Sequence, residues 1–204
     1  MPNLVIHEQQ AEAYQKKQNI KFKMKKIIIT CLITLFVTMG LVHLYNNWYI
    51  DYNLRKYSVY YAHNMEHKEG THPEIAMALE NMDVIYKPKK KNIRYREDGT
   101  FIVYNTIKES EQVIMSCNPG EKELRYIYYN TMDKSCFFNE KFSLTNIYNR
   151  SIGEYEKDIS TIDQGALYKE IHKNFGFLIE ANVNSKPIIN MQKEFNKKYY
   201  KRFN

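Results

Sequence analysis

Three of the chain's six histidines lie within ten residues, in a stretch whose side chains are of the types that bind metal ions. The stretch reads AHNMEHKEGTH and contains His63, His67 and His72, with Glu66 between the first two. On a helix, residues three and four apart share one face, so His63, Glu66 and His67 are expected to lie together. Two imidazoles and a third ligand can hold zinc, and a nearby glutamate can serve as general base. His63, His67 and His72 are therefore the candidate metal ligands.

The five residues from His63 to His67 resemble the H-x-x-E-H motif of inverted zinc peptidases. The resemblance covers these five positions alone, and those peptidases use much larger domains. A solvated helix end explains the same residues, because a glycine such as Gly70 and cationic histidines both suit a helix C-terminus. We favour this interpretation and expect no cofactor. The sequence also lacks a nucleophile elbow, a phosphate loop and a dinucleotide fingerprint. No catalytic residues are assigned, and binding is favoured over catalysis.

An apolar segment near the N-terminus is the strongest feature of the sequence. Residues 27–45 read IIITCLITLFVTMGLVHLY, 19 residues without Asp, Glu, Lys or Arg. As a helix they cover roughly 28 Å, close to the hydrocarbon thickness of a bilayer. Threonine hydroxyls are tolerable there because they can bond to the preceding helical turn. An aromatic belt of Tyr45, Trp48 and Tyr49 follows. We predict a transmembrane helix over residues 27–47, and the alternative is a buried core helix.

The charges beside this segment predict its orientation. Lys16, Lys17, Lys21, Lys23, Lys25 and Lys26 precede it, whereas only Arg55 and Lys56 follow within a short distance. The positive-inside rule then puts residues 1–26 in the cytoplasm, as a short tail, and residues 48–204 outside it. A cleaved signal peptide is the main alternative, but LYNNWYIDYN has bulky residues where cleavage requires small ones. We therefore expect a retained anchor in the cell membrane, with a periplasmic domain if the source is bacterial.

Residues 48–204 show helical patterns first, then strands, then helices again. Apolar residues recur at helical spacing over 50–65, and Thr71 with Pro73 predicts a second helix start. Asp98-Gly99 between alternating segments predicts a β-hairpin, and Pro119-Gly120 predicts a turn between two further strands. Near the end, Asp163 predicts one helix N-cap, and Ser185 with Pro187 predicts another helix start. This order predicts an α+β domain of helices packed on an antiparallel sheet.

Two of the three cysteines lie in the predicted outer domain, where oxidation can occur. We expect Cys117 and Cys136 to form a disulfide, which would stabilise the fold by about 3 kcal/mol. One difficulty is visible from the sequence. In a simple meander the two residues lie on strands that are not neighbours, at opposite ends of the sheet. A disulfide needs the two Cα atoms within about 7 Å, so the alternative is two free thiols.

The last nineteen residues combine an apolar stripe with a basic face. Ile188, Met191, Phe195, Tyr199 and Phe203 recur at helical spacing and are expected to pack on their own domain. The basic face is the candidate interaction surface, for anionic lipid headgroups or an acidic partner. Its residues are Lys193, Lys197, Lys198, Lys201 and Arg202.

These features predict a single-pass membrane protein with an outer binding or assembly domain. The expected partners are the lipid bilayer and other membrane or envelope proteins, and a homo-oligomer is compatible with the pattern. Nucleic acid is not expected as a partner, despite a net charge of +7, because the predicted topology puts the domain outside the cytoplasm. In architecture alone, the layout resembles inner-membrane scaffold subunits of bacterial secretion and conjugation machines. The alternatives are a pilin-like subunit, although the processing glycine of that family is missing, and a small membrane-tethered zinc hydrolase using His63, Glu66 and His67.

Overall fold

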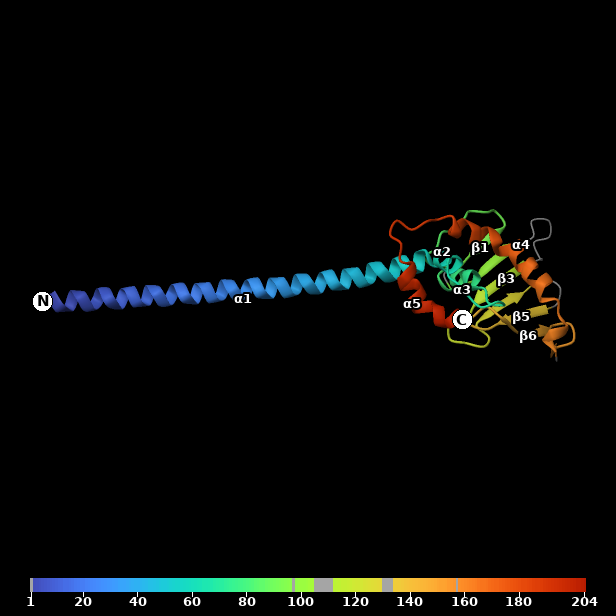
Figure 1. Cartoon of the computed structure of the whole chain (residues 1–204), viewed down its shortest axis with the longest axis horizontal. Coiled ribbons are helices and arrows are strands. Elements are labelled where there is room, and N and C mark those ends of the chain that lie inside the picture. The colour runs from blue at the N-terminus through green and yellow to red at the C-terminus, as the bar shows by residue number, and fades with distance from the viewer. Residues whose placement is uncertain (1, 97, 105–111, 130–133, 157) are drawn as a thin grey trace. The chain divides into compact units, whose positions relative to one another are not determined.

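The computed structural model describes residues 2–96, 98–104, 112–129, 134–156 and 158–204 (Figure 1). The chain divides into two compact units, residues 1–50 and 51–204. In chain order the elements are α1 (Pro2–Lys56), α2 (Ser58–His63), α3 (Pro73–Glu80), β1 (Ile93–Tyr95), β2 (Phe101–Tyr104), β3 (Gln112–Cys117), β4 (Tyr126–Tyr129), β5 (Lys134–Phe138), β6 (Leu144–Asn149), β7 (Glu154–Tyr155), a short 3₁₀ helix (Ile159–Thr161), α4 (Gln164–Val183) and α5 (Gln192–Phe203). The predicted α+β class is confirmed.

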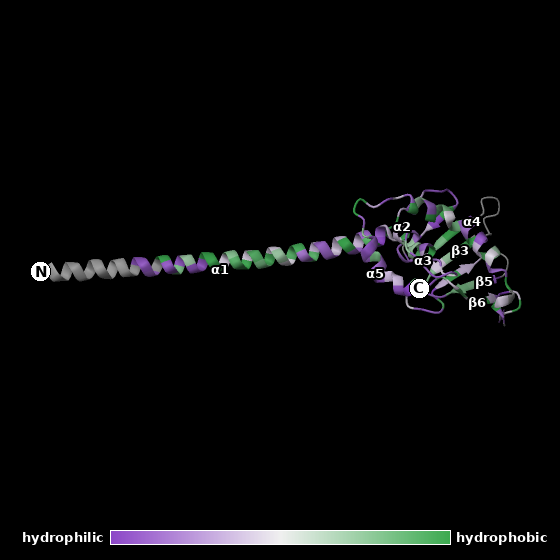
Figure 2. Ribbon diagram, in the orientation of Figure 1, coloured by the Kyte–Doolittle hydropathy of each residue, from purple (hydrophilic) through white to green (hydrophobic). Residues whose placement is uncertain are grey.

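Helix α1 contains the apolar segment, drawn mainly green in Figure 2. Its stretch from Lys16 to Lys56 is long and apolar enough to cross a membrane, and none of its most apolar part is buried by protein. The hydroxyls of Thr30, Thr34 and Thr38 each donate to the carbonyl oxygen four residues earlier, at 2.7–2.9 Å, as expected. Those polar groups therefore need no water. Tyr45 also packs near Trp48 and Tyr49, with ring centroids 6.4 and 6.2 Å away.

The helical segment expected over residues 50–65 is interrupted in the structure. Helix α1 ends at Lys56, and α2 ends at His63 rather than at Gly70. The chain leaves the helix because tertiary partners hold its backbone. The Lys68 N–H donates to the Phe203 carbonyl at 3.0 Å, and the Asn204 side chain donates to the Glu66 carbonyl at 2.9 Å. Helix α3 begins at Pro73, as predicted, but its N-cap is His72 and not Thr71, and no side chain caps it.

The sheet is an antiparallel meander in which the seven strands are neighbours in sequence order. The predicted hairpin at Asp98-Gly99 is confirmed between β1 and β2. The Asp98 side chain accepts from the Thr100 N–H at 3.0 Å, and Gly99 has a φ of +82°. The turn predicted at Pro119-Gly120 lies between β3 and β4.

One row of side chains crosses five strands on the same sheet face, because each residue is directly opposite the next. The row is buried and consists of Phe101, Met115, Tyr128, Cys136 and Ile147. Helix α4 packs on this face (Figure 1). Its Phe175 meets Phe101 edge-to-face at 4.8 Å between ring centroids. This helix–sheet contact is part of the buried core.

The two C-terminal helices differ in how well their starts were predicted. The Asp163 side chain accepts from the Ala166 N–H at 2.9 Å, which confirms the N-cap of α4. Helix α5 begins at Gln192, not after Ser185. The intervening loop is held instead by Tyr61 of α2, whose hydroxyl donates to the Ile189 carbonyl and accepts from the Met191 N–H.

Candidate functional site

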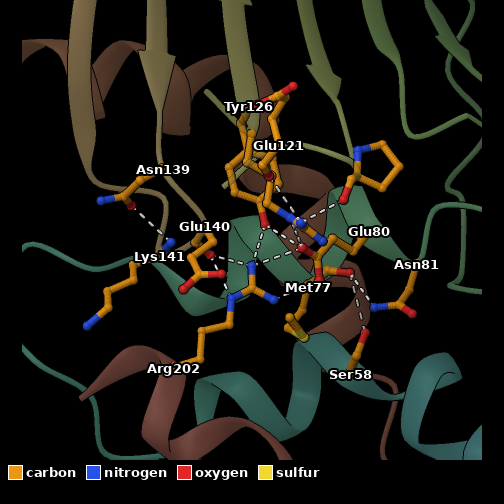
Figure 3. Close-up of polar contacts among 12 residues, drawn as sticks. Ser58, Met77, Glu80, Asn81, Glu121, Tyr126, Asn139, Glu140, Lys141 and Arg202 are labelled. Carbon is orange, nitrogen blue, oxygen red and sulfur yellow. Dashed lines mark hydrogen bonds and ion pairs between the residues drawn. The ribbon is translucent and has the colours of Figure 1, made fainter. Parts of the chain in front are cut away.

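A cluster of polar side chains is centred on Glu80, the last residue of α3 (Figure 3). The guanidinium of Arg202 binds both carboxylate oxygens, each at 2.9 Å. Arg125 donates from Nε to Oε1 at 2.6 Å, and the Tyr126 hydroxyl donates to the same oxygen at 2.8 Å. Arg202 also donates to the Tyr126 oxygen and to the Glu140 carbonyl. We call Glu80, Arg125, Tyr126 and Arg202 the Glu80 cluster.

The Glu80 cluster is largely shielded from water. The side chains of Glu80, Arg125 and Arg202 are 13%, 18% and 16% exposed. Burial alone would raise the pKa of Glu80, but hydrogen bonds and charge from Arg202, followed by Tyr126 and Arg125, hold that pKa below its ordinary value. Burial and the Glu80 charge raise the pKa of Tyr126. The resting state is therefore a carboxylate, a neutral phenol and two guanidinium groups.

This arrangement suits a structural connection better than proton transfer. A carboxylate with a lowered pKa is a weak general base, and a phenol with a raised pKa is a weak acid. The cluster instead joins the end of α3, strand β4 and helix α5, which are far apart in the sequence. Because the Arg202 guanidinium is largely buried and bound to Glu80, Arg202 does not belong to the exposed basic face that the sequence predicted.

A cavity of about 460 Å³ lies beside the cluster and includes Cys117 in its lining. Burial, and then the negative charge of Glu80, raises the pKa of the Cys117 thiol to about 11. Burial raises the pKa of the Cys136 thiol to about 11 as well. Both thiols are protonated at neutral pH, which makes them poor nucleophiles.

The disulfide expected between Cys117 and Cys136 is absent, and both residues are free thiols. The register gives the reason. Cys117 is opposite Tyr126 and Cys136 is opposite Tyr128, so β4 lies between the two cysteines. Two strand spacings amount to about 9.6 Å, which exceeds the reach of a disulfide. Tyr126 and Tyr128 are two residues apart on β4 and therefore share one face of the sheet. Their partners Cys117 and Cys136 lie on that same face but too far apart to bond.

The structure does not bring the candidate metal ligands His63, His67 and His72 together around one point. Because α2 ends at His63, Glu66 and His67 lie beyond the helix and do not share a helical face with it. His63 pairs with Glu74 at 3.4 Å, and His67 contacts the Thr71 hydroxyl at 3.1 Å. In the part of the chain that the structure describes, no group of three or more His, Cys, Asp or Glu side chains has a geometry that could hold a metal ion.

His63 and His72 nevertheless line one cavity of about 390 Å³, together with His172 of α4. His72 stacks on Tyr168, with ring centroids 3.9 Å apart, and burial lowers the pKa of His72. Ile75 and Ile179 contribute apolar walls. His172 lies a hundred residues after His72, so no spacing within the stretch could have identified it. The cavity is a small, mainly apolar pocket with an imidazole rim.

Four of the five residues of the candidate interaction surface are exposed. Lys193, Lys197, Lys198 and Lys201 are exposed on α5, while the opposite side of that helix buries Phe195 and Phe203 completely. The apolar stripe therefore packs on its own domain, as expected. Ile188 is the exception: it precedes the helix and is 95% exposed.

Sequence reasoning missed Glu80, although one local signal was available. A carboxylate at a helix C-terminus opposes the helix dipole, and α3 has no basic residue in its last turn. Such a placement indicates cationic partners from elsewhere in the chain. Which arginines supply them is set by tertiary structure alone, since Arg202 is 122 residues away.

Comparison with known proteins adds no assignment: no protein-family model, curated protein or solved structure matches this chain.

Proposed function

We propose that this chain is a single-pass membrane protein whose C-terminal domain is a binding or assembly subunit of a cell-envelope complex, such as a secretion or conjugation machine. Residues 1–26 are then cytoplasmic, residues 27–47 cross the membrane, and residues 48–204 lie outside the cytoplasm. The partners are the bilayer and other envelope proteins.

The apolar part of α1 is the observation that carries the proposal. Its large apolar side chains are about half to two-thirds exposed in the structure, which is costly in water but favourable in lipid. The threonine hydroxyls within it are satisfied by the helix backbone. Lysines gather before the segment and aromatic residues after it, in the arrangement typical of a membrane anchor.

The second unit supports a role in binding because its buried charges are used to fix one surface helix. The Glu80 cluster attaches α5 at Arg202, and the buried Phe195 and Phe203 hold the same helix to the core. A rigidly held helix then presents its lysines to the surroundings. Preorganised surfaces of this kind lose little entropy when a partner binds.

Three measurements on native membranes test the proposal. The full chain should remain in the pellet after alkaline carbonate extraction. A reporter fused after Asn204 should be active outside the cytoplasm, and crosslinking should give discrete high-mass products that contain other envelope proteins. Release by carbonate, or a cytosolic reporter, contradicts the membrane assignment. An intact mass near 24.5 kDa separates the retained anchor from a processed, pilin-like subunit.

A further inference from the structure

The loop between α4 and α5, residues 184–191, carries two adjacent apolar side chains at the surface. Ile188 is 95% exposed and Ile189 is 50% exposed. The loop backbone is nevertheless fixed. The buried Tyr61 hydroxyl donates to the Ile189 carbonyl at 3.1 Å and accepts from the Met191 N–H at 3.2 Å, and the Gln192 side chain donates to the Tyr61 carbonyl at 2.8 Å. The backbone that carries Ile189 is thus fixed by specific hydrogen bonds, next to the exposed Ile188.

This loop lies at the end of the second unit where the chain enters it. Lys198 of α5 pairs with Asp51 at 3.2 Å, which ties α5 to the first residues of that unit. Figure 1 shows the loop at the same end as residues 51–56. Asp51 is only six residues after Tyr45, the last residue of the apolar segment, so the chain can separate the two by at most roughly 20 Å. With the segment in a bilayer, this end of the unit is close to the headgroups.

Exposed lysines flank the two isoleucines on both sides in the sequence. Lys186 precedes them in the loop, and Lys193, Lys197 and Lys201 follow at four-residue intervals along the exposed side of α5. Apolar residues flanked by lysines are typical of segments that lie in the interface of an anionic bilayer. The apolar side chains enter the region between headgroups and acyl chains, while the ammonium groups remain among the phosphates.

We infer that the α4–α5 loop and the lysine face of α5 form a docking surface for the anionic lipid bilayer in which the same chain is anchored. Ile188 and Ile189 insert at the headgroup boundary, and Lys186, Lys193, Lys197 and Lys201 bind lipid phosphates. This inference rests on the proposed membrane anchor and adds a second, reversible contact with lipid. It fixes which face of the domain is turned away from the bilayer and remains open to protein partners.

Tryptophan fluorescence of the full chain tests the inference. The chain has a single tryptophan, so Trp48→Phe combined with Ile188→Trp leaves one reporter in the loop. The protein is reconstituted into vesicles of phosphatidylcholine with brominated acyl chains, alone or mixed with phosphatidylglycerol. With the anionic lipid we expect a blue-shifted emission that is quenched by bromine more strongly than in phosphatidylcholine alone, because binding depends on anionic headgroups. Lys193→Gln, Lys197→Gln and Lys201→Gln together should return the quenching to its level in phosphatidylcholine.

A matched control uses Trp48→Phe with Ile152→Trp. Ile152 is also exposed, at 65%, and lies in the turn between β6 and β7. Figure 1 shows β6 at the opposite end of the unit from the α4–α5 loop. Its emission should be unquenched in both vesicles. Equal or absent quenching of the loop reporter in the two lipids overturns the docking surface, including the case in which a protein partner covers the loop in the cell. Carbonate extraction of the same vesicles separates this outcome from failure of the anchor itself.

Discussion

Glu80 occupies a position that helix electrostatics alone would disfavour, at the C-terminal end of α3. The Glu80 cluster reverses this by surrounding one carboxylate with two guanidinium groups and a phenol. A buried ion pair of this kind contributes less net stability than its contacts suggest, because both charges lose their water. Removing only one partner of the pair is strongly destabilising, because the remaining charges are then buried without a compensating charge.

The first prediction concerns Glu80→Gln. This change leaves Arg125 and Arg202 close together with no negative charge between them, and we expect a loss of about 3–5 kcal/mol in the free energy of unfolding. For a domain of this size the melting temperature should fall by roughly 10 °C. Glu123→Gln is the matched control, because Glu123 is exposed and its side chain is outside the cluster. Thermal unfolding of the two purified variants should separate them clearly, and equal melting temperatures would contradict a structural role.

The second prediction is the pH dependence of the same contact. The folded-state pKa of Glu80 lies below its ordinary value of 4.5, so the folded state favours the ionised carboxylate. The stabilisation is therefore complete above about pH 5 and is lost as the pH falls through the folded-state pKa. Urea unfolding from pH 7 to pH 3 should show the wild type approaching Glu80→Gln in stability at the acid end. A difference that stays constant to pH 3 would argue against the cluster as its source.

At the scale of elements, the hairpin between β1 and β2 depends on one glycine. Gly99 has a φ of +82°, and a Cβ atom there would lie 2.7 Å from the Leu79 carbonyl oxygen and 3.0 Å from the Cys117 Cβ. The hairpin turn thus packs directly against the end of α3. Both the backbone conformation and the available space require glycine.

The third prediction follows from this close approach. We expect Gly99→Ala to destabilise the protein by about 2–4 kcal/mol, from backbone strain and from the clash with Leu79. Gly120→Ala serves as control, because a Cβ atom at Gly120 has only Asn118 Oδ1 within 4 Å, at 3.9 Å. Its effect on unfolding in urea should be close to zero. Equal stability of the two variants would contradict the close packing of this turn against α3.

The elements that sequence reasoning predicted correctly are those with local causes. Asp98-Gly99 sets a turn through its own backbone, and Asp163 caps α4 through a hydrogen bond three residues away. The burial of Phe195 and Phe203 follows from helical spacing. In each case the residues that decide the structure are neighbours in the sequence.

The elements that were placed wrongly are decided by distant partners. Helix α2 stops at His63 because residues 66 and 68 bond to the chain's C-terminal end, and this removes the helical face on which the metal hypothesis depended. Helix α5 starts late because Tyr61 holds the loop before it. The Glu80 cluster joins residues up to 122 positions apart. Propensity and periodicity contain no information about such contacts.

For the whole molecule, the proposed membrane anchor makes orientation the property that would decide which compartment contains the domain and which partners it meets. The proposed orientation depends on the lysines that precede the apolar segment, because positive charges close to a span are retained in the cytoplasm. Only Arg55 and Lys56 oppose them from the other side within the range over which the rule acts. The balance is therefore set by a small number of residues that can be changed without touching the folded domain.

The fourth prediction tests this balance by neutralising the lysines before the segment. The change is glutamine at six positions, Lys16, Lys17, Lys21, Lys23, Lys25 and Lys26. With the bias then favouring Arg55 and Lys56, we expect a substantial fraction of chains to insert with the C-terminus in the cytoplasm. Paired reporters fused after Asn204, alkaline phosphatase and green fluorescent protein, should shift from phosphatase activity towards fluorescence. Glutamine at Lys87, Lys89, Lys90 and Lys91 is the control, since these lysines are too far from the span to influence insertion. An unchanged reporter ratio in the first variant would mean that something other than flanking charge orients the chain.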